Sequence, residues 1–265
     1  ETNFKEAVKI AGEIETYNSD RKELDKLITY EALKQIETTN EQQDFSTVVY
    51  SETWHKGVIG IVASRLIETY YRPTLVFTKS GDKLAASARS VKGFDVYNAI
   101  DQCAEFVEQF GGHKYAAGLT LLPENYEKFK AKFEKVVKKT IPEELRTPEI
   151  SVNSEMNLCD INQKFYRILN QFAPFGPQNM RPIFVANGLR DNGFGKCVGE
   201  DKSHLKLNLI DATDKKTYNA IGFGLGHKKE ITSNGNSFKA AFNLDENNWN
   251  GMTSIQLLLK DIKPE

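Results

Sequence analysis

Cysteine is scarce in this chain. Its 265 residues include three cysteines, Cys103, Cys159 and Cys197, which lie far apart and form no Cys-x-x-Cys pair. An odd and scattered set argues against a disulfide framework and against a cysteine-bound zinc ion. Because unpaired cysteines are typical of reducing compartments, we expect a cytoplasmic protein.

Long apolar runs and a secretion signal are absent as well. No apolar segment approaches the roughly 18 residues that are needed to span a bilayer. The first residues do not have the layout of a signal peptide. We therefore expect no membrane partner.

The chain has no excess of charge of either sign. It carries 35 Lys and Arg against 36 Asp and Glu, a formal net charge of −1. A nucleic-acid partner would therefore have to be bound by local basic patches. The sequence also lacks the short motifs of zinc proteases, P-loop proteins and serine hydrolases, and it has no Asp or His cluster with metal-ligand spacing. We predict no metal site within this chain.

Residues 1–40 are predicted to be helical, because apolar residues recur among Lys and Glu with helical spacing. Asn18, Ser19 and Asp20 have side chains that cap helices, which predicts a break into two connector helices. Because these helices begin abruptly at Glu1, we expect the chain to be a piece of a longer protein.

Residues 41–141 alternate strand-like and helix-like segments, which predicts an α/β domain. The expected strands are 45–50, 75–77, 84–88 and 118–122, and the expected helices are 58–70, 94–110 and 126–139. Residues 142–265 begin with a linker and a helix at 161–172. Apolar and polar residues then alternate in several short segments, which predicts an all-β domain, an OB-type barrel. The alternating segments lie at 205–209, 238–244 and 255–259.

The segment from Gly111 to Gly118 holds three glycines, two alanines and His113. Small residues allow a ligand to approach the backbone, and a histidine can donate to an oxyanion. We interpret Gly111, Gly112 and His113 as part of a phosphate-contacting loop. The alternative is a glycine turn leading into a strand, with His113 as a surface side chain.

The segment Ala85-Ala86-Ser87-Ala88-Arg89-Ser90 reads as a strand of small residues, which leaves space on a sheet face. Arg89, with Ser87 and Ser90, combines a planar fork of donors with two hydroxyls and could grip a phosphate. The alternative is that the small residues accommodate a neighbouring helix and that Arg89 forms a surface salt bridge.

His55 and Lys56 precede a helix that we expect to begin near Val58. Free backbone N–H groups at a helix start favour anions, and these two side chains would add positive charge. A capping or packing role is the alternative for His55, and Trp54 is expected to be a core residue.

Basic and aromatic residues are interleaved in the barrel segment. This pattern is typical of single-strand binding, which uses charge for the backbone and rings for the bases. The alternative is a solvated lysine face over an aromatic core. The basic residues are Lys196, Lys202, His204, Lys206, Lys215, Lys216, His227, Lys228 and Lys229, and the aromatic residues are Phe194, Tyr218, Phe223 and Trp249.

Together these segments resemble the C-terminal part of the RecJ family, single-strand-specific 5′→3′ DNA exonucleases of the DHH/DHHA1 phosphoesterase superfamily. The resemblance covers nearly the whole chain. It implies a DHHA1 domain with a mixed sheet at residues 41–141 and an OB-fold DNA-binding domain at 142–265. The matching stretches are Trp54 to Ile61, Arg72-Pro73, Ser87 to Ser90, Gly111 to Gly118, Phe175 to Asn179 and His204 to Lys206.

The resemblance also implies roles for the residues singled out above. Ser87, Arg89 and Ser90 would contact the terminal phosphate region of a single DNA strand. Gly111, Gly112 and His113 would line the same cleft near the scissile phosphate, with His113 in a supporting catalytic role. His55 and Lys206 would be further substrate-binding residues, and the barrel would follow the downstream strand.

The metal-binding DHH domain of the family has no counterpart in this sequence. We expect it as an N-terminal partner within the full-length enzyme, where it would hold Mn²⁺ or Mg²⁺ and act in DNA repair and recombination. We predict that the present chain alone is inactive. Two other functions remain open: part of a phosphodiesterase for short oligonucleotides or cyclic dinucleotides, and a non-catalytic nucleic-acid-binding module similar to the appendage of alanyl-tRNA synthetase.

Overall fold

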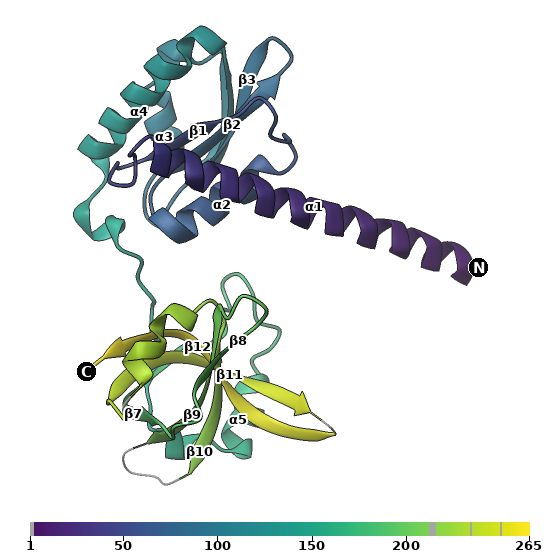
Figure 1. The fold of residues 1–265 in the computed structure, drawn as a ribbon, viewed down its shortest axis with the longest axis vertical. Coiled ribbons are helices and arrows are strands. Elements are labelled where there is room, and N and C mark those ends of the chain that lie inside the picture. Colours follow the sequence, from purple (N-terminus) through teal and green to yellow (C-terminus); the bar gives the residue numbers. More distant parts are fainter. Residues whose placement is uncertain (1–2, 212–215, 234, 250) are drawn as a thin grey trace. The chain divides into compact units, whose positions relative to one another are not determined.

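The chain forms two compact units, Glu1–Pro148 and Glu149–Glu265. Figure 1 shows both units in a computed structural model that describes residues 3–211, 216–233, 235–249 and 251–265. The first unit extends beyond residue 141, because Ile141 and Leu145 pack against its core. Within the described ranges, no helix is long and apolar enough to cross a membrane.

A five-stranded mixed sheet forms the centre of the first unit, with the strand order β1-β2-β3-β5-β4. β1 and β2 are parallel, and the other neighbouring strands are antiparallel. Most of β2 is buried, as expected for a strand that is covered on both faces. The strands are β1 (Thr47–Tyr50), β2 (Thr74–Ser80), β3 (Lys83–Arg89), β4 (Gln109–His113) and β5 (Ala116–Leu121).

Helices cover the two faces of this sheet unequally (Figure 1). α3 (Val96–Asp101) and α4 (Tyr126–Thr140) pack over one face and share a core with residues of all five strands. On the other face, α2 (Ile59–Tyr70) and the C-terminal part of α1 (Phe4–Thr38) form a separate core whose strand residues come from β1 and β2. The same face of β5 and β4 therefore stays open within the described part of the unit.

The two connector helices expected in residues 1–40 form a single helix in the structure. α1 runs unbroken from Phe4 to Thr38, so the predicted break at residues 18–20 is wrong. The side chain of Asn18 accepts a hydrogen bond from Arg21 Nη2 instead of capping a new helix. Capping residue types are compatible with an exposed helix interior, and no Gly or Pro interrupts the chain at this point.

The helix expected at 94–110 is also wrong. α3 ends at Asp101, a short 3₁₀ turn spans Ala104–Phe106, and β4 begins at Gln109. Strand pairing with β5 takes these residues out of the helical path, and the ring of Phe110 packs 5.2 Å from that of Tyr97. The glycine segment is consequently a β-hairpin, with strands on both sides of Lys114 and Tyr115, rather than a loop.

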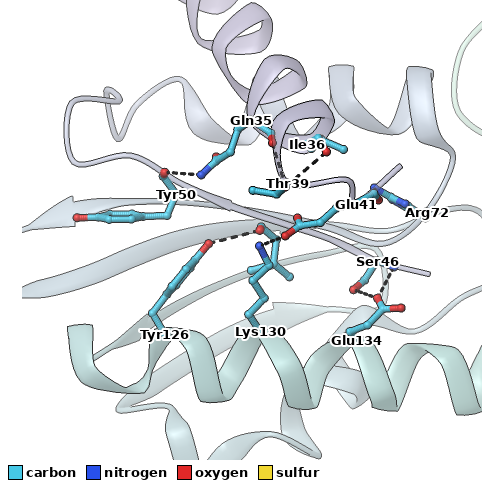
Figure 2. A network of polar contacts seen from close by, with 11 residues as sticks. Gln35, Ile36, Thr39, Glu41, Ser46, Tyr50, Arg72, Tyr126, Lys130 and Glu134 are labelled. Carbon is cyan, nitrogen blue, oxygen red and sulfur yellow. Dashed lines mark hydrogen bonds and ion pairs between the residues drawn. The ribbon is translucent and has the colours of Figure 1, made fainter. Parts of the chain in front are cut away.

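A polar network fastens the end of α1 to the sheet and to α4 (Figure 2). The buried guanidinium of Arg72 donates to the carbonyl oxygens of Glu41, Gln42 and Asp44 and to Thr47 Oγ1. On α4, Glu134 accepts hydrogen bonds from the backbone of Phe45 and Ser46, and Lys130 forms a 2.6 Å ion pair with Glu41. The segment between α1 and β1 is thus held from both sides.

The second unit is built around a five-stranded barrel. Strands β7, β11, β12, β10 and β9 follow one another in the sheet, and the pairing of β7 with β9 closes the ring. β10 and β12 are parallel, whereas the other barrel pairs are antiparallel. The prediction of an OB-type barrel is confirmed, and with it the fold class. The strands are β6 (Ser154–Glu155), β7 (Phe184–Asp191), β8 (Lys196–Val198), β9 (His204–Asp211), β10 (Thr217–Gly222), β11 (Phe238–Trp249) and β12 (Met252–Pro264).

One α-helix precedes the barrel strands. α5 (Gln163–Asn170) packs Tyr166 against the barrel core, and Asn162 caps its start by accepting from the backbone N–H of Phe165. Short 3₁₀ turns complete the fold at Pro123–Asn125, Glu143–Arg146, Leu158–Asp160 and Gly226–Thr232.

Candidate nucleic-acid interface

The open face of the first sheet carries the residues singled out from the sequence. In the register of β3, β5 and β4, Ser87 lies opposite Gly118, which lies opposite Gly111. Two positions further along, Arg89 and His113 lie opposite the same residue, Ala116. Residues directly opposite one another share a sheet face, so the register places both rows on the face that carries α2 and that stays open over β5 and β4.

A groove of about 400 Å³ lies along this face. Its floor is made of small residues, because the two glycines contribute no side chain and Ser87 contributes a short one. A Cβ on Gly111 would meet nothing within 4 Å, and a Cβ on Gly118 would come no closer than 3.7 Å to another atom. The fold does not need glycine at Gly111 for packing, so the bare floor is available to a ligand. Lys56, Ser87, Gln109, Gly111, Gly118 and Thr120 are among the residues that line the groove.

Neither Arg89 nor His113 is among the residues that line the groove. Arg89 lies beside the start of α2, next to Gly60. Its Nη1 donates to the carbonyl oxygen of Ala88 at 2.8 Å, and its Nη2 lies 2.8 Å from the point where a Cβ of Gly60 would stand. Ser87 Oγ lies 3.5 Å from the same point. In the described part of the chain, no carboxylate forms an ion pair with Arg89.

The start of α2 adds a second anion-binding element beside Arg89. Its N-cap residue, Val58, makes no side-chain capping hydrogen bond. Uncapped backbone N–H groups and the helix dipole together favour an anion at this end. The guanidinium, the hydroxyl of Ser87 and the helix start thus converge on one place. Gly60 was not predicted as a site residue, although a glycine in the first turn of a helix is unfavourable and was a usable signal.

The two candidate histidines share one hydrogen-bonding arrangement. His113 Nδ1 accepts from the backbone N–H of Tyr115 at 3.3 Å, and His55 Nδ1 accepts from that of Gly57 at 3.1 Å. Because a backbone N–H can only donate, the neutral rings carry their proton on Nε2. Both histidines are exposed, and the Nε2–H of each ring remains as a donor for an anion.

Two other predicted site residues are used within the fold. Gly112 has φ of +146°, and a Cβ there would overlap the backbone of Ala116 and Ala117. The hydroxyl of Ser90 donates to the carbonyl oxygen of Phe94 at 2.9 Å. The backbone N–H of Ser90 donates to the carbonyl oxygen of Tyr115. Both residues shape the hairpin and its neighbouring loop, and a phosphate contact at either stays a prediction.

Lys206 lies in the second unit, on the outer face of the barrel. It is exposed on β9, where it pairs in register with Lys196 of β8 and with Ile221 of β10. Near the start of β9, the rings of His204 and Phe223 meet edge to face at 5.1 Å, and Phe223 is 63% exposed. The outer face thus presents two lysines and one accessible ring.

Some of the other predicted basic and aromatic residues make contacts within the barrel unit, and others are exposed. Lys228 forms an ion pair with Asp261, and Lys229 donates to the carbonyl oxygen of Gly195. Tyr218 is buried in the barrel core, whereas Phe194 is exposed. Lys215 lies outside the described residues, and so does the side chain of Trp249.

The described residues contain no group of three His, Cys, Asp or Glu side chains that could hold a metal ion. The described donors therefore do not fit a two-metal centre. What this arrangement can do chemically is to hold a phosphate, orient it and neutralise its charge.

Comparison with known proteins identifies both units. The DHHA1 domain family matches residues 44–139, and the RecJ OB domain family matches residues 152–261. The single-stranded-DNA-specific exonuclease RecJ of Bacillus subtilis is 30% identical over 97% of this chain and 32% of its own length. RecJ of Escherichia coli is 27% identical over 99% of this chain and 46% of its own length.

A solved structure agrees with the fold of the whole chain. The crystal structure of RecJ from Thermus thermophilus in complex with Mg²⁺ matches this chain with a TM-score of 0.78 at 24% sequence identity. The match covers 100% of this chain and 39% of the Thermus chain. Its complex with Mn²⁺ gives a TM-score of 0.79. The chain spans less than half the length of these relatives. It is homologous to the C-terminal region of the RecJ single-stranded-DNA-specific exonucleases and consists of a DHHA1 domain followed by a RecJ OB domain.

Proposed function

We propose that this chain is the substrate-binding part of a RecJ-like single-stranded-DNA exonuclease and that the groove on the first sheet holds the phosphates of the strand. The observation that carries this proposal is the convergence of the Arg89 guanidinium and the Ser87 hydroxyl on the start of α2, beside a glycine-floored groove that Ser87 helps to line. Three kinds of anion-binding group meet there, and no carboxylate of the described residues pairs with the guanidinium.

Each group has a distinct task in this proposal. Arg89 donates to two phosphate oxygens, which fixes the orientation of the phosphate as well as its position. The Nε2–H of His113 donates to the same strand from the other side of Ala116 and supports the negative charge that grows on a phosphate during hydrolysis. Gly111 and Gly118 let the sugar–phosphate chain approach the sheet closely.

The bond-breaking chemistry is proposed to lie outside this chain. The solved RecJ structures of Thermus thermophilus contain Mg²⁺ or Mn²⁺, and divalent ions supply an activated water and charge stabilisation to phosphodiester hydrolysis. We expect an N-terminal DHH domain of the full-length, cytoplasmic protein to hold them. The isolated chain is expected to bind DNA without cutting it.

The barrel is proposed to follow the strand beyond the groove. OB folds bind oligonucleotides on the outer face of their second and third strands, which correspond here to β9 and β10. Lys196 and Lys206 would neutralise backbone phosphates, and Phe223 would stack on a base. His55 would provide a further donor near the start of α2.

Binding of labelled single strands, measured by fluorescence anisotropy, tests this function. Arg89→Ala should weaken binding by roughly 1–3 kcal/mol and reduce the salt slope by about 0.7, since one phosphate contact is lost. Arg65→Ala is the matched control, because Arg65 is an exposed arginine of the neighbouring helix α2 that pairs with Asp25 and Glu68. Equal affinities of the Arg89 and Arg65 variants would refute the groove.

The same assay separates the two other functions. A dinucleotide, a strand of about 20 nucleotides and a transfer RNA are compared on the unmodified chain. Tight binding of the dinucleotide alone would indicate a small-substrate phosphodiesterase. Preference for the transfer RNA would indicate a non-catalytic module for structured RNA. We expect the longer DNA strand to bind most tightly, because both units contact it.

A further inference from the structure

A second groove lies in the barrel unit, and its lining includes no residue of β9 or β10. It has a volume of about 540 Å³ and is formed by α5 on one side and β11 on the other. Its lining is Gln163, Lys164, Tyr166, Arg167 and Asn170 from α5 and Glu246 from β11.

α5 is fixed in place beside this groove, because its apolar side chains pack into the barrel. Tyr166 lines the groove but is only 5% exposed, and the ring of Phe165 lies 5.9 Å from that of Phe184. The exposed part of the helix is polar. Gln163, Arg167 and Asn170 are four and then three positions apart, so they follow one another along one face of the helix.

The polar side chains of the groove are not engaged with each other. In the described part of the chain, Gln163, Arg167 and Asn170 make no side-chain hydrogen bond or ion pair, and the same holds for Lys164 and Glu246. The neighbouring residues contrast with this, since Arg181 donates to Asp245 and to the carbonyl oxygen of Leu244. The fold therefore uses the polar groups beside the groove but not those that line it.

These free groups are chemically suited to nucleobases. Amides and guanidinium groups pair with the edges of purines, and a carboxylate accepts from the amino group of cytosine. Lys164 adds a charge for the backbone. A groove for phosphates alone would not include a carboxylate, because Glu246 can only accept and would repel a phosphate.

The position of the groove connects it with the barrel. Glu246 belongs to the hairpin of β11 and β12, where it lies opposite Ile255. In OB folds, the loop that joins these last two strands borders the oligonucleotide-binding face. A strand that crosses β9 and β10 and passes this hairpin would reach α5 next.

We propose that the groove between α5 and β11 binds bases of the single DNA strand that leaves the outer face of the barrel. This inference rests on the proposed function. It adds a base-contacting site to a protein whose other contacts are made mainly with the backbone. The groove is therefore expected to matter for long strands with bases and not for short or base-free ones.

The test uses the whole chain with the uncharged double change Gln163→Ala and Asn170→Ala. Both side chains are on the surface of α5, and their removal changes no charge, so a loss of affinity cannot come from weaker electrostatics. The matched control is Gln43→Ala with Gln102→Ala, two exposed amides of the first unit. The probes are strands of about 6 and about 20 nucleotides, and a 20-nucleotide strand without bases in its distal half.

We expect the Gln163/Asn170 variant to bind the long strand roughly threefold to tenfold more weakly, and the short and partly base-free strands as tightly as the unmodified chain. Unchanged binding of the long strand, or an equal loss on all three probes, would overturn the base-contacting groove. Arg89→Ala and Lys206→Ala are measured in parallel. If they weaken binding and the α5 variant does not, only this inference fails; if they have no effect, the proposed function itself fails.

Discussion

The guanidinium of Arg89 lies in the space that a side chain on Gly60 would occupy, with Nη2 2.8 Å from the position of the missing Cβ. Gly60 stands in the first turn of α2, where glycine is about 1 kcal/mol less favourable than alanine in a helix. Glycine therefore lowers the stability of α2 at this position, and its missing side chain leaves space for the guanidinium of Arg89 from β3. This relationship makes it possible to separate folding from binding.

Gly60→Ala should leave the fold intact and weaken DNA binding. The new methyl group displaces the flexible end of Arg89 rather than any backbone, while alanine favours the helix. We expect an unchanged or higher melting temperature together with a loss of affinity that approaches that of Arg89→Ala. Gly12→Ala is the control, because Gly12 is a helical glycine of α1 with nothing within 4 Å of its missing Cβ. Loss of affinity in both variants would contradict the explanation.

The adjacent glycines Gly111 and Gly112 should respond to alanine in opposite ways. Gly111→Ala places a methyl group on the open groove floor, so the protein should fold normally and bind DNA less well. Gly112→Ala forces a positive φ on alanine, which costs about 1–3 kcal/mol, and it overlaps the backbone of Ala116 as well. Urea denaturation measures the second effect and anisotropy measures the first. A Gly112→Ala variant as stable as the unmodified chain would show that the hairpin is not constrained in this way.

Arg72 should be essential for the stability of the first unit. Its guanidinium is buried and donates to three carbonyl oxygens and one hydroxyl. Arg72→Met leaves these acceptors without a partner, and we expect a loss of about 3 kcal/mol in the free energy of unfolding. Arg65→Met removes an exposed arginine and should cost less than about 1 kcal/mol. Denaturation curves that shift equally for both variants would refute the role of the buried donor.

Regular packing made much of the fold predictable from the sequence. The helix expected at 126–139 is confirmed as α4, where Tyr126, Phe129, Phe133 and Val137 recur at helical spacing and are all buried. The alternating segments of the barrel were expected for the same reason with a period of two. The helix expected at 94–110 was wrong in its second half. The apolar spacing there is compatible with a helix, but pairing with β5 makes Gln109–His113 a strand. Local pattern cannot reveal a partner strand that comes later in the chain.

The candidate site was predictable in its residues but not in its geometry. Arg89 and His113 were singled out from local composition, yet only the register brings both to Ala116. A shift of one residue would move either side chain to the opposite face of the sheet. The space beside Gly60 depends on how α2 packs over β3, which leaves no pattern in the sequence. The assignment of these residues to phosphate binding stays a prediction.

Asp44 should make the stability of the first unit depend on pH. Burial raises the pKa of this carboxyl above its ordinary value, and Glu134 and Glu41 raise it further, while Arg72 and Lys130 act in the opposite direction. The folded protein therefore binds the proton of Asp44 more tightly than the unfolded chain. Between the ordinary pKa of about 4 and the raised value, the stability contributed by this group falls as pH rises.

Asp44→Asn removes that contribution, because asparagine does not titrate. We expect the variant to melt at a higher temperature than the unmodified chain at pH 7, and we expect the difference to shrink as pH falls below about 4, where Asp44 is protonated in both states. Asp20→Asn, on the exposed part of α1, removes the same charge without a buried carboxyl cluster and is the control. If the two variants show the same pH profile, net charge explains the effect and the surroundings of Asp44 do not.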